Sequence, residues 1–473
     1  MRIAMIGAGY VGLVSAACFA EMDHEVVASD VDAVKIDSLK KGVLPIYEPQ
    51  LASIVRKTLA NRRLSFVVNR QEAVHRAEAV FIAVGTPPRN GDGKADLSSV
   101  QAAVREIAAS LGPGALVVIK STVPVGTSDD MEALVRELQP RLRAAVVSNP
   151  EFLRAGSAVQ DFKRPDRVVI GAEDDEAAAK LVQVYAPLGL RPEKIVRTSR
   201  RSAELIKYAG NAFLATKIAF INEMADLCER VGANVEDIAR GIGADSRIGP
   251  DFLKAGPGFG GSCFPKDTLA LVKMGQDEAS PMRIVEAVVA VNDMRKSTIA
   301  RRVEQALGER ARGKTIAVLG LTFKSDTDDL RQSPSLSLIA SLQDKGAVVR
   351  AYDPVAMPRA KTMLADIVFC RNAYAAAKGA DAVVLMTEWK EFRALDLQRL
   401  SKCMKRALLV DMRNLLDPER CVEAGFSYHG VGRDTPRTSI DSRVPSVPVP
   451  RSVNRKAQRR PIYVNGNGAL AEA

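Results

Sequence analysis

The residues best suited to chemistry lie in the stretch GPGFGGSCFPKD, which runs from Gly256 to Asp267. Its four glycines let a backbone approach a ligand closely or turn through positive φ without strain. Pro265 is typical of the first positions of a helix, which places Cys263 just before a helix N-terminus with Lys266 within one turn. Both features favour the thiolate, the nucleophilic form of cysteine. The stretch therefore predicts a nucleophilic cysteine, and these twelve residues alone leave an ordinary loop with an inert cysteine as the alternative.

The remaining cysteines and histidines indicate neither a metal site nor a histidine-based triad. Six cysteines occupy positions 18, 228, 263, 370, 403 and 421, without a CxxC pair, and three histidines occupy positions 24, 75 and 429. This spacing matches neither a disulfide framework nor a zinc site. We therefore expect no metal, and we expect acid–base work to fall to Lys, Glu, Asp or bound water.

A dinucleotide-binding pattern opens the chain. The apolar run at 2–6 leads into GAGYVG at 7–12, helix-forming residues follow, and a second strand-like run ends at Asp30. In this context the glycines let a pyrophosphate sit at the helix N-terminus, and the acidic residue accepts hydrogen bonds from the adenosine ribose. The Asp30 carboxylate would repel a 2′-phosphate, so the pattern favours NAD over NADP.

Three further strand-like runs each end in polar residues. The runs at 79–84, 115–119 and 144–147 are followed by Thr86, Thr122 and Glu151 respectively. Ligands of open parallel sheets bind beyond the carboxyl ends of the strands, so these three residues are candidates for the ligand site. Turn formation and helix capping are the alternative roles for each.

The middle and the end of the chain predict a helical section and then a second α/β section. From 199 to 231 the apolar residues recur at helical spacing, which indicates one long helix and a candidate dimer interface. Lys207 and Asn211 stand four residues apart and share a face of that helix, pointing either to solvent or into a cleft. Strand-like runs return between 314 and 411, without a second GxGxxG.

At 473 residues the chain is too long for one hydrophobic core. We expect an α/β fold in which two Rossmann-like doubly wound domains are joined by a central helical domain with a long spine helix. The expected divisions are an NAD-binding domain at 1–198, a helical domain with the cysteine loop at 199–310, a second Rossmann-like domain at 311–433 that could hold a different nucleotide, and a disordered basic tail at 434–473.

Composition and charge narrow the functional classes. Hydrophobic residues make up 47% of the chain and charged residues 26%, as in ordinary globular proteins. The net charge is +11, and the segment 434–473 holds seven Lys/Arg against three Asp/Glu. The mildly basic remainder suits a nucleotide ligand without requiring nucleic acid. No apolar run is long enough to span a bilayer and no secretion signal is evident, so we expect no membrane partner and a cytoplasmic location.

Six motifs, found in order over residues 1–433, resemble the UDP-glucose/GDP-mannose dehydrogenase family. They are GAGYVG at 7–12, STVPVGT at 121–127, NPEFL at 149–153, ELIKYAGNAF at 204–213, GFGGSCFPKD at 258–267 and LTFKSDTDDLRQSP at 321–334. The resemblance implies oxidation of the C6 alcohol of UDP-glucose to the carboxylate, using two NAD and one water. A cysteine captures the intermediate aldehyde as a thiohemiacetal, which is oxidised to a thioester and then hydrolysed.

The resemblance also implies roles for individual residues. It makes Cys263 the nucleophile and Lys207 the group that stabilises the oxyanion. It implies that Asn211 and Asp267 position water and the neighbouring lysine. It implies that Thr122 and Glu151 act in water activation and proton transfer. It implies NAD contacts by Gly7, Gly9, Tyr10, Val11, Gly12, Asp30, Lys35, Thr86, Ser121, Thr122, Lys266 and Arg331. UDP-sugar contacts are implied for Glu151, Phe152, Leu153, Lys207, Asn211, Phe252, Gly260, Lys324 and Arg413, and Arg247 matches an arginine supplied across a homodimer interface.

One departure and three alternatives stand beside this interpretation. Many family members carry a glutamate where this chain has Ala155, so Glu151 must serve hydrolysis without it. Within the family, GDP-mannose or UDP-N-acetylmannosamine is the competing substrate. A two-electron hydroxyacid dehydrogenase would leave Cys263 and the section after 314 unexplained. A nucleotide-binding protein that is not an enzyme would instead depend on its basic tail.

Overall fold

The computed structural model describes residues 1–89 and 93–433, which all belong to one compact unit. The predicted basic tail at 434–473 lies outside the described residues. Among the helices that the structure describes, none is both long and apolar enough to cross a membrane.

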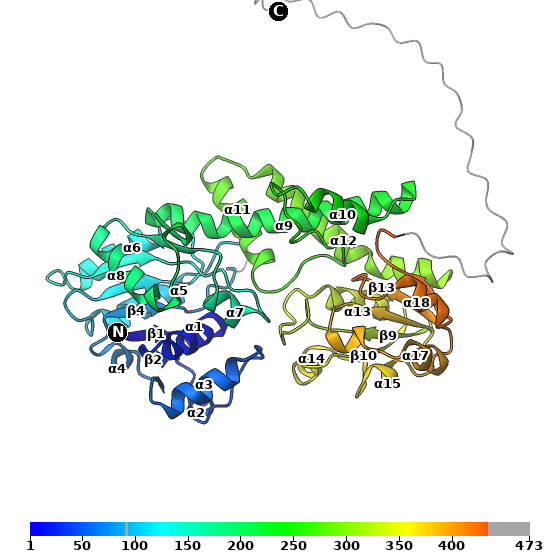
Figure 1. The fold of residues 1–473 in the computed structure, drawn as a ribbon, viewed down its shortest axis with the longest axis horizontal. Coiled ribbons are helices and arrows are strands. Elements are labelled where there is room, and N and C mark those ends of the chain that lie inside the picture. The colour runs from blue at the N-terminus through cyan, green and yellow to red at the C-terminus, as the bar shows by residue number, and fades with distance from the viewer. Residues whose placement is uncertain (90–92, 434–473) are drawn as a thin grey trace, which may run out of the picture. The chain divides into compact units, whose positions relative to one another are not determined.

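The first sheet of the described chain has eight strands in the order β3-β2-β1-β4-β5-β6-β7-β8. Figure 1 labels β1, β2 and β4 of this sheet among the helices around them. The strands are β1 (Arg2–Ile6), β2 (Glu25–Ser29), β3 (Leu64–Val67), β4 (Ala79–Ile82), β5 (Leu116–Ile119), β6 (Ala145–Ser148), β7 (Val168–Gly171) and β8 (Ile195–Thr198). Every neighbouring pair is parallel except β6 and β7, which pair antiparallel. The first six strands have the doubly wound order that brings ligands to the switch point between β1 and β4.

Helices cover both faces of this sheet because its strands are apolar on both sides. Along β1, Ile3 and Met5 enter one core cluster with α1, α7 and α8, while Ala4 and Ile6 enter another with α4, α5 and α6. The helices are α1 (Tyr10–Glu21), α2 (Ala33–Lys40), α3 (Leu51–Ala60), α4 (Arg70–Val74), α5 (Ser98–Ala108), α6 (Thr127–Leu138), α7 (Ala158–Lys163) and α8 (Asp175–Tyr185).

The central section is helical, as predicted. It contains α9 (Arg200–Val231), α10 (Val235–Gly243), α11 (Phe264–Asp277) and α12 (Arg283–Leu307), and residues 199–314, all described, form no strand. The Ser199 side chain caps the start of α9, and Gly232 ends it at φ +71°. At 32 residues the helix is about 48 Å long, and it packs against β7, α11 and α12.

The second sheet, counted over the described residues, has six strands in the order β11-β10-β9-β12-β13-β14, which repeats the order of the first six strands of the first sheet. The strands are β9 (Thr315–Leu319), β10 (Val348–Tyr352), β11 (Val368–Phe369), β12 (Ala382–Leu385), β13 (Leu408–Asp411) and β14 (Ser427–His429). Around it lie α13 (Pro334–Asp344), α14 (Met357–Met363), α15 (Ala373–Ala377), α16 (Lys390–Arg393), α17 (Leu397–Cys403) and α18 (Pro418–Glu423). The predicted fold class is confirmed.

Candidate active site

The cysteine loop is a tightly packed turn that leads into α11. Cys263 occupies the N-cap position of α11, as predicted. Gly258 and Gly261 have φ of +107° and +83°, which other residues rarely adopt. A Cβ on Gly260 would lie 2.3 Å from the carbonyl oxygen of Gln332, and one on Gly261 would meet the ring of Phe323. Glycine is therefore required where the loop packs against the segment that follows β9.

Lys207 and Glu151 form a buried ion pair. The Lys207 Nζ atom lies 3.0 Å from Glu151 Oε1, and the side chains of the two residues are 4% and 6% exposed. Glu151 Oε2 also accepts a hydrogen bond of 2.6 Å from the N–H of Leu153. Burial disfavours the ammonium, but Glu151, Cys263 and Asp267 together outweigh burial and raise the pKa of Lys207. Lys207 therefore stays charged inside the site.

One turn further along α9, Asn211 joins the helix to α11. Its amide donates a hydrogen bond of 2.6 Å to Asp267 Oδ2, and both side chains are buried. The opposite oxygen of Asp267 lies 2.9 Å from Lys266 Nζ. Of the two orientations left open by the sequence, Lys207 and Asn211 adopt the one that points away from solvent.

Glu204, three residues before Lys207, fixes α9 against the loop after β5. Its carboxylate accepts hydrogen bonds of 2.7 and 2.8 Å from the N–H groups of Gly126 and Ser128, at the start of α6. Those N–H groups have no partner within α6 itself, so Glu204 acts as a cap supplied by another helix. One turn of α9 thereby holds both the Thr122 loop and the Glu151 loop.

The electrostatic prediction for Cys263 was wrong. The sequence favoured a thiolate, but burial and the nearby Glu151 carboxylate raise the pKa of the Cys263 thiol, and Lys207 opposes them only in part. Lys266, which was expected to help, is paired with Asp267 instead. These surroundings therefore favour the thiol over the thiolate, although Cys263 is partly accessible and stands at a helix start.

The residues after β1 and β2 fit a dinucleotide. Gly7 has φ +105°, and a Cβ on Gly12 would lie 1.9 Å from the Gly7 carbonyl oxygen, whereas a Cβ on Gly9 would meet nothing within 4 Å. The turn is thus close-packed on its inner side and open on the side where a pyrophosphate would approach the start of α1. The structure brings Tyr10 and Val11, the first residues of α1, to the same place.

Asp30 stands at the carboxyl end of β2, where a ribose would lie. Its carboxylate accepts hydrogen bonds of 3.0 Å from the N–H of Ala8 and 2.9 Å from Lys35 Nζ. Burial opposes ionisation of Asp30, but these hydrogen bonds outweigh it and lower the pKa of the carboxyl. The group is therefore a fixed anion, as an NAD preference requires.

Two loops at the carboxyl ends of β4 and β5 are tied together. The Thr86 hydroxyl donates a hydrogen bond of 2.8 Å to the carbonyl of Thr122, and the Ser121 hydroxyl donates one of 2.7 Å to the carbonyl of Val84. The backbone N–H of Ser121 also donates a hydrogen bond to the carbonyl of Ile82. Ser121 links the loops, and Thr122 keeps a partly exposed side chain.

The C-terminal sheet presents a further group of the predicted residues. Arg331 accepts a hydrogen bond of 2.8 Å from the Gly261 N–H through its carbonyl. Arg413 donates hydrogen bonds of 2.7 and 2.9 Å to the carbonyls of Phe323 and Met386. Burial lowers the pKa of Lys324. These residues lie beside the cysteine loop and beyond the carboxyl ends of β9, β12 and β13.

Phe252 and Arg247 lie on the loop that follows α10. The Phe252 ring centroid is 6.0 Å from that of Phe264, next to Cys263. Arg247 is exposed and paired with Asp245, so it makes no contact with the rest of the described site. The structure brings together the other predicted substrate residues and leaves Arg247 outside.

Sequence reasoning missed two cations near Glu151. The Arg167 guanidinium lies 3.6 Å from the centre of the Phe152 ring. Lys120 is buried, donates hydrogen bonds of 3.1 Å to both Asn149 and Tyr185, and burial lowers its pKa to about 8. No motif distinguishes either residue from an ordinary surface cation.

Comparisons with known proteins match all three sections of the described fold. Three consecutive family models cover residues 1–189, 201–294 and 317–418, described as the NAD-binding, central and UDP-binding domains of UDP-glucose/GDP-mannose dehydrogenases. The chain belongs to this family. As a member of the UDP-glucose/GDP-mannose dehydrogenase family it uses NAD, which agrees with the open side of the Gly9 turn and with the ionised Asp30.

Similar proteins include two UDP-glucose 6-dehydrogenases. That of Rhizobium meliloti is 56% identical over 92% of this chain and 100% of its own length. That of Pseudomonas aeruginosa is 48% identical over 92% and 98%. The solved structure of a UDP-glucose dehydrogenase from Pyrobaculum islandicum is 40% identical, with a TM-score of 0.84 over 91% of this chain and 98% of its own. Among the described residues, no group of three or more His, Cys, Asp or Glu is placed to hold a metal.

Proposed function

We propose that this dehydrogenase oxidises UDP-glucose to UDP-glucuronate, consuming two NAD and one water per sugar. The observation that carries the proposal is a partly accessible cysteine within electrostatic reach of the buried Lys207, on a loop packed against the segment that follows β9. The names and the 56% and 48% identities of the two relatives support the same substrate.

The glycine turn and Asp30 would hold NAD, which when bound would accept the hydride in each oxidation. In the first, the C6 hydroxyl of the sugar loses a proton as its carbon loses the hydride. Glu151 is the proton acceptor that we assign, directly or through a water beside the Thr122 hydroxyl. Lys207 and the Leu153 N–H bond the Glu151 carboxylate and orient it.

Cys263 then adds to the aldehyde. The new C–S bond forms as the carbonyl oxygen becomes an alkoxide, and the thiol proton leaves. Lys207 Nζ stabilises that alkoxide, and Asn211, held by Asp267, provides a second donor. Because burial raises the pKa of the Cys263 thiol, deprotonation accompanies attack. Glu151 and Asp267 both lie within electrostatic reach of the thiol, and we assign the proton to Glu151 because Asp267 is already bonded to Asn211 and Lys266.

The second oxidation leaves a thioester, which water hydrolyses. We assign activation of that water to Glu151, since Ala155 provides no second carboxylate in the loop. Hydrolysis breaks the C–S bond, returns the proton to Cys263 and releases the sugar carboxylate. A single carboxylate thereby serves as proton acceptor in every step, and it releases the alcohol proton and then the thiol proton to solvent before it accepts the next one.

We further propose a homodimer formed through α9. Four large apolar residues repeat along one side of this helix and are exposed: Phe213, Phe220, Leu227 and Val231 at 67%, 48%, 48% and 65%. Exposed apolar residues at this spacing favour burial against a second helix. Arg247 would reach the partner's site from the loop after α10. The divisions at 1–198, 199–310 and 311–433, and a cytoplasmic location, belong to the same proposal.

The test is the yield of NADH per sugar. With limiting UDP-glucose, the wild-type enzyme should give two NADH and one acid, and Cys263→Ala should give no acid. GDP-mannose and UDP-N-acetylmannosamine are run in parallel, because a UDP-D-ManNAc dehydrogenase from Pyrococcus horikoshii is 28% identical with a TM-score of 0.80. A single NADH per sugar, or acid from Cys263→Ala, would refute the mechanism. Higher kcat/KM for another sugar would refute the substrate.

A further inference from the structure

Three buried side chains from α9 and α12 grip the backbone of the cysteine loop. Asn222 accepts a hydrogen bond of 2.8 Å from the N–H of Gly256, and Arg295 Nε donates one of 2.6 Å to its carbonyl. Asn292 accepts one of 2.8 Å from the N–H of Phe259 and donates one of 3.2 Å to its carbonyl. All three gripping side chains are less than a tenth exposed.

These hydrogen bonds hold the loop in close contact with α12. A Cβ on Gly258 would lie 2.8 Å from Asn292 Oδ1. On the opposite side, Gly260 and Gly261 pack against residues that follow β9. The loop is therefore held between α12 and the second sheet, and it reaches Cys263 only two residues after the last of these contacts.

Arg295 is itself held by a series of consecutive ion pairs. Its Nη1 lies 2.9 Å from Asp226 Oδ1, and Asp226 also pairs with Arg302. Arg302 Nη1 lies 2.7 Å from Glu229 Oε1, which accepts a hydrogen bond of 2.8 Å from the N–H of Gly432.

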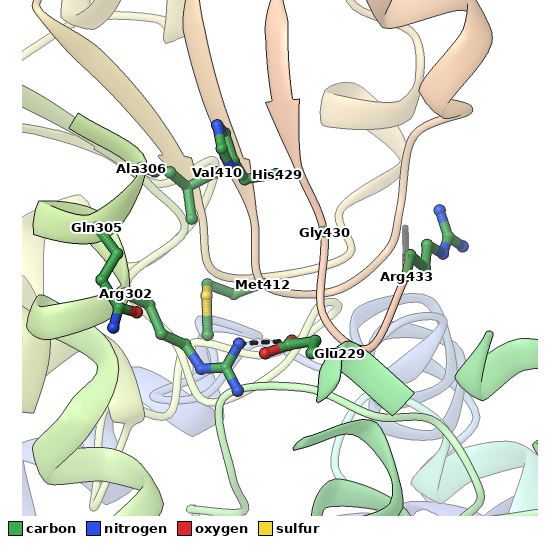
Figure 2. Close-up of a pocket in the computed structure, with 9 residues that line it drawn as sticks. All are labelled: Glu229, Arg302, Gln305, Ala306, Val410, Met412, His429, Gly430 and Arg433. Carbon is green, nitrogen blue, oxygen red and sulfur yellow. Dashed lines mark hydrogen bonds and ion pairs between the residues drawn. The ribbon is translucent and has the colours of Figure 1, made fainter. Parts of the chain in front are cut away.

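Figure 2 shows the outer end of this series, where the Arg302–Glu229 pair lines a cavity of about 260 Å³. The cavity walls come from α9, α12 and the ends of β13 and β14. The series of ion pairs therefore runs from the cysteine loop to the cavity that α9 and α12 form with the ends of β13 and β14.

We propose that Arg295 is a positioning residue for catalysis, which sets the place of Cys263 through the Gly256 carbonyl. Asp226 fixes the guanidinium, the guanidinium fixes the loop, and the loop fixes the sulfur. A displacement of the nucleophile by about 1 Å costs on the order of a hundredfold in rate. The role for Arg295 rests on the proposed function, because only covalent capture requires the sulfur to be held at one position.

The test replaces Arg295 and compares the alkylation rates of Cys263 and Cys403. Arg295→Gln is matched by Arg301→Gln, an exposed arginine on the same helix. Steady-state kinetics give kcat with UDP-glucose and KM for NAD. Iodoacetamide labelling, read by mass spectrometry, gives the alkylation rate of Cys263 relative to Cys403, the other partly accessible cysteine of the described chain.

For Arg295→Gln we expect kcat to fall at least tenfold, with KM for NAD within twofold of wild type. The Cys263/Cys403 alkylation ratio should rise at least threefold, because the loop is released locally. Arg301→Gln should match wild type in all three measurements. General destabilisation would instead raise both alkylation rates together, and that outcome overturns the positioning role.

Arg295→Lys provides the second variant. Lysine keeps the attraction to Asp226 but cannot bond Asp226 and the Gly256 carbonyl through one rigid fork. We expect kcat to fall at least threefold in this variant and the alkylation ratio to rise. If Arg295→Gln does not fold, Arg295→Lys decides, and a folded variant with wild-type kcat and alkylation ratio overturns the inference. The labelling measures loop position without turnover, so it remains decisive even if UDP-glucose proves not to be the substrate.

Discussion

Replacing Lys207 by methionine should destabilise the protein far more than the loss of one contact suggests. The substitution shortens the unbranched side chain by one atom and removes a cation 3.0 Å from Glu151 Oε1, where both side chains are less than a tenth exposed. Breaking a buried pair on one side leaves an uncompensated charge, which costs about 3–5 kcal/mol. Glu151→Gln should cost a similar amount, because it leaves the ammonium unpaired.

The double variant, Lys207→Met with Glu151→Gln, separates stability from function. With no charge left buried, its free energy of unfolding should lie within about 2 kcal/mol of wild type. Activity should not recover, since the oxyanion donor and the base are both gone. We expect kcat at least about a hundredfold below wild type in all three variants.

Urea unfolding followed by circular dichroism gives the free energies, and NADH formation gives kcat. Lys273→Met is the control, because Lys273 and Asp277 form a pair at 2.6 Å with side chains 28% and 35% exposed. A surface pair of this kind contributes about 1 kcal/mol or less. Destabilisation in the double variant equal to the sum of the two single variants would refute the coupling, and wild-type kcat in Lys207→Met would refute the role in chemistry.

Three other predictions follow from single positions. Gly258→Ala should lower kcat at least tenfold, because it places a Cβ 2.8 Å from Asn292 Oδ1 at a residue with φ +107°. The control is Gly308→Ala, where φ is +70° and a Cβ would meet nothing within 4 Å; it should lower the melting temperature and leave kcat unchanged. Asp30→Ser should lower kcat/KM for NAD by about one to two orders of magnitude and that for NADP much less, since a 2′-phosphate is no longer repelled. Burial lowers the pKa of Lys120 to about 8 from 10.5, so over that interval the unfolded chain binds a proton that the folded chain does not, and stability rises with pH. In urea unfolding, wild type should gain about 3 kcal/mol over Lys120→Met between pH 8 and 10.5, and none below pH 7.

The sequence predicted those parts of the fold and site that depend on local pattern. The dinucleotide turn, the strand ends that carry Thr86, Thr122 and Glu151, and the helix from 199 to 231 are each visible within a short window. The shared face of Lys207 and Asn211 follows from their spacing alone. The sequence does not predict which residues contact Lys207 and Asn211, because the partners are distant in the chain: Glu151 and Lys207 are 56 positions apart.

The errors and omissions have physical causes. The pKa of Cys263 depends on burial and on Glu151, neither of which the neighbouring residues encode. The antiparallel pairing of β6 and β7 involves one register pair, too little to leave a pattern. Asn292 and Arg295 are polar residues in a helix, which ordinarily indicates a solvated face, whereas here they face a backbone that needs partners.

Because Glu204 caps α6, the rotation of α9 about its own axis determines whether the active site is assembled. Glu204 and Lys207 contact two different loops from one helical turn. Inserting or deleting one residue ahead of them would rotate both by about 100° and shift them by about 1.5 Å. No compensating change in one loop could restore both contacts, so variation in chain length can be absorbed in surface turns but not between Arg200 and Asn211.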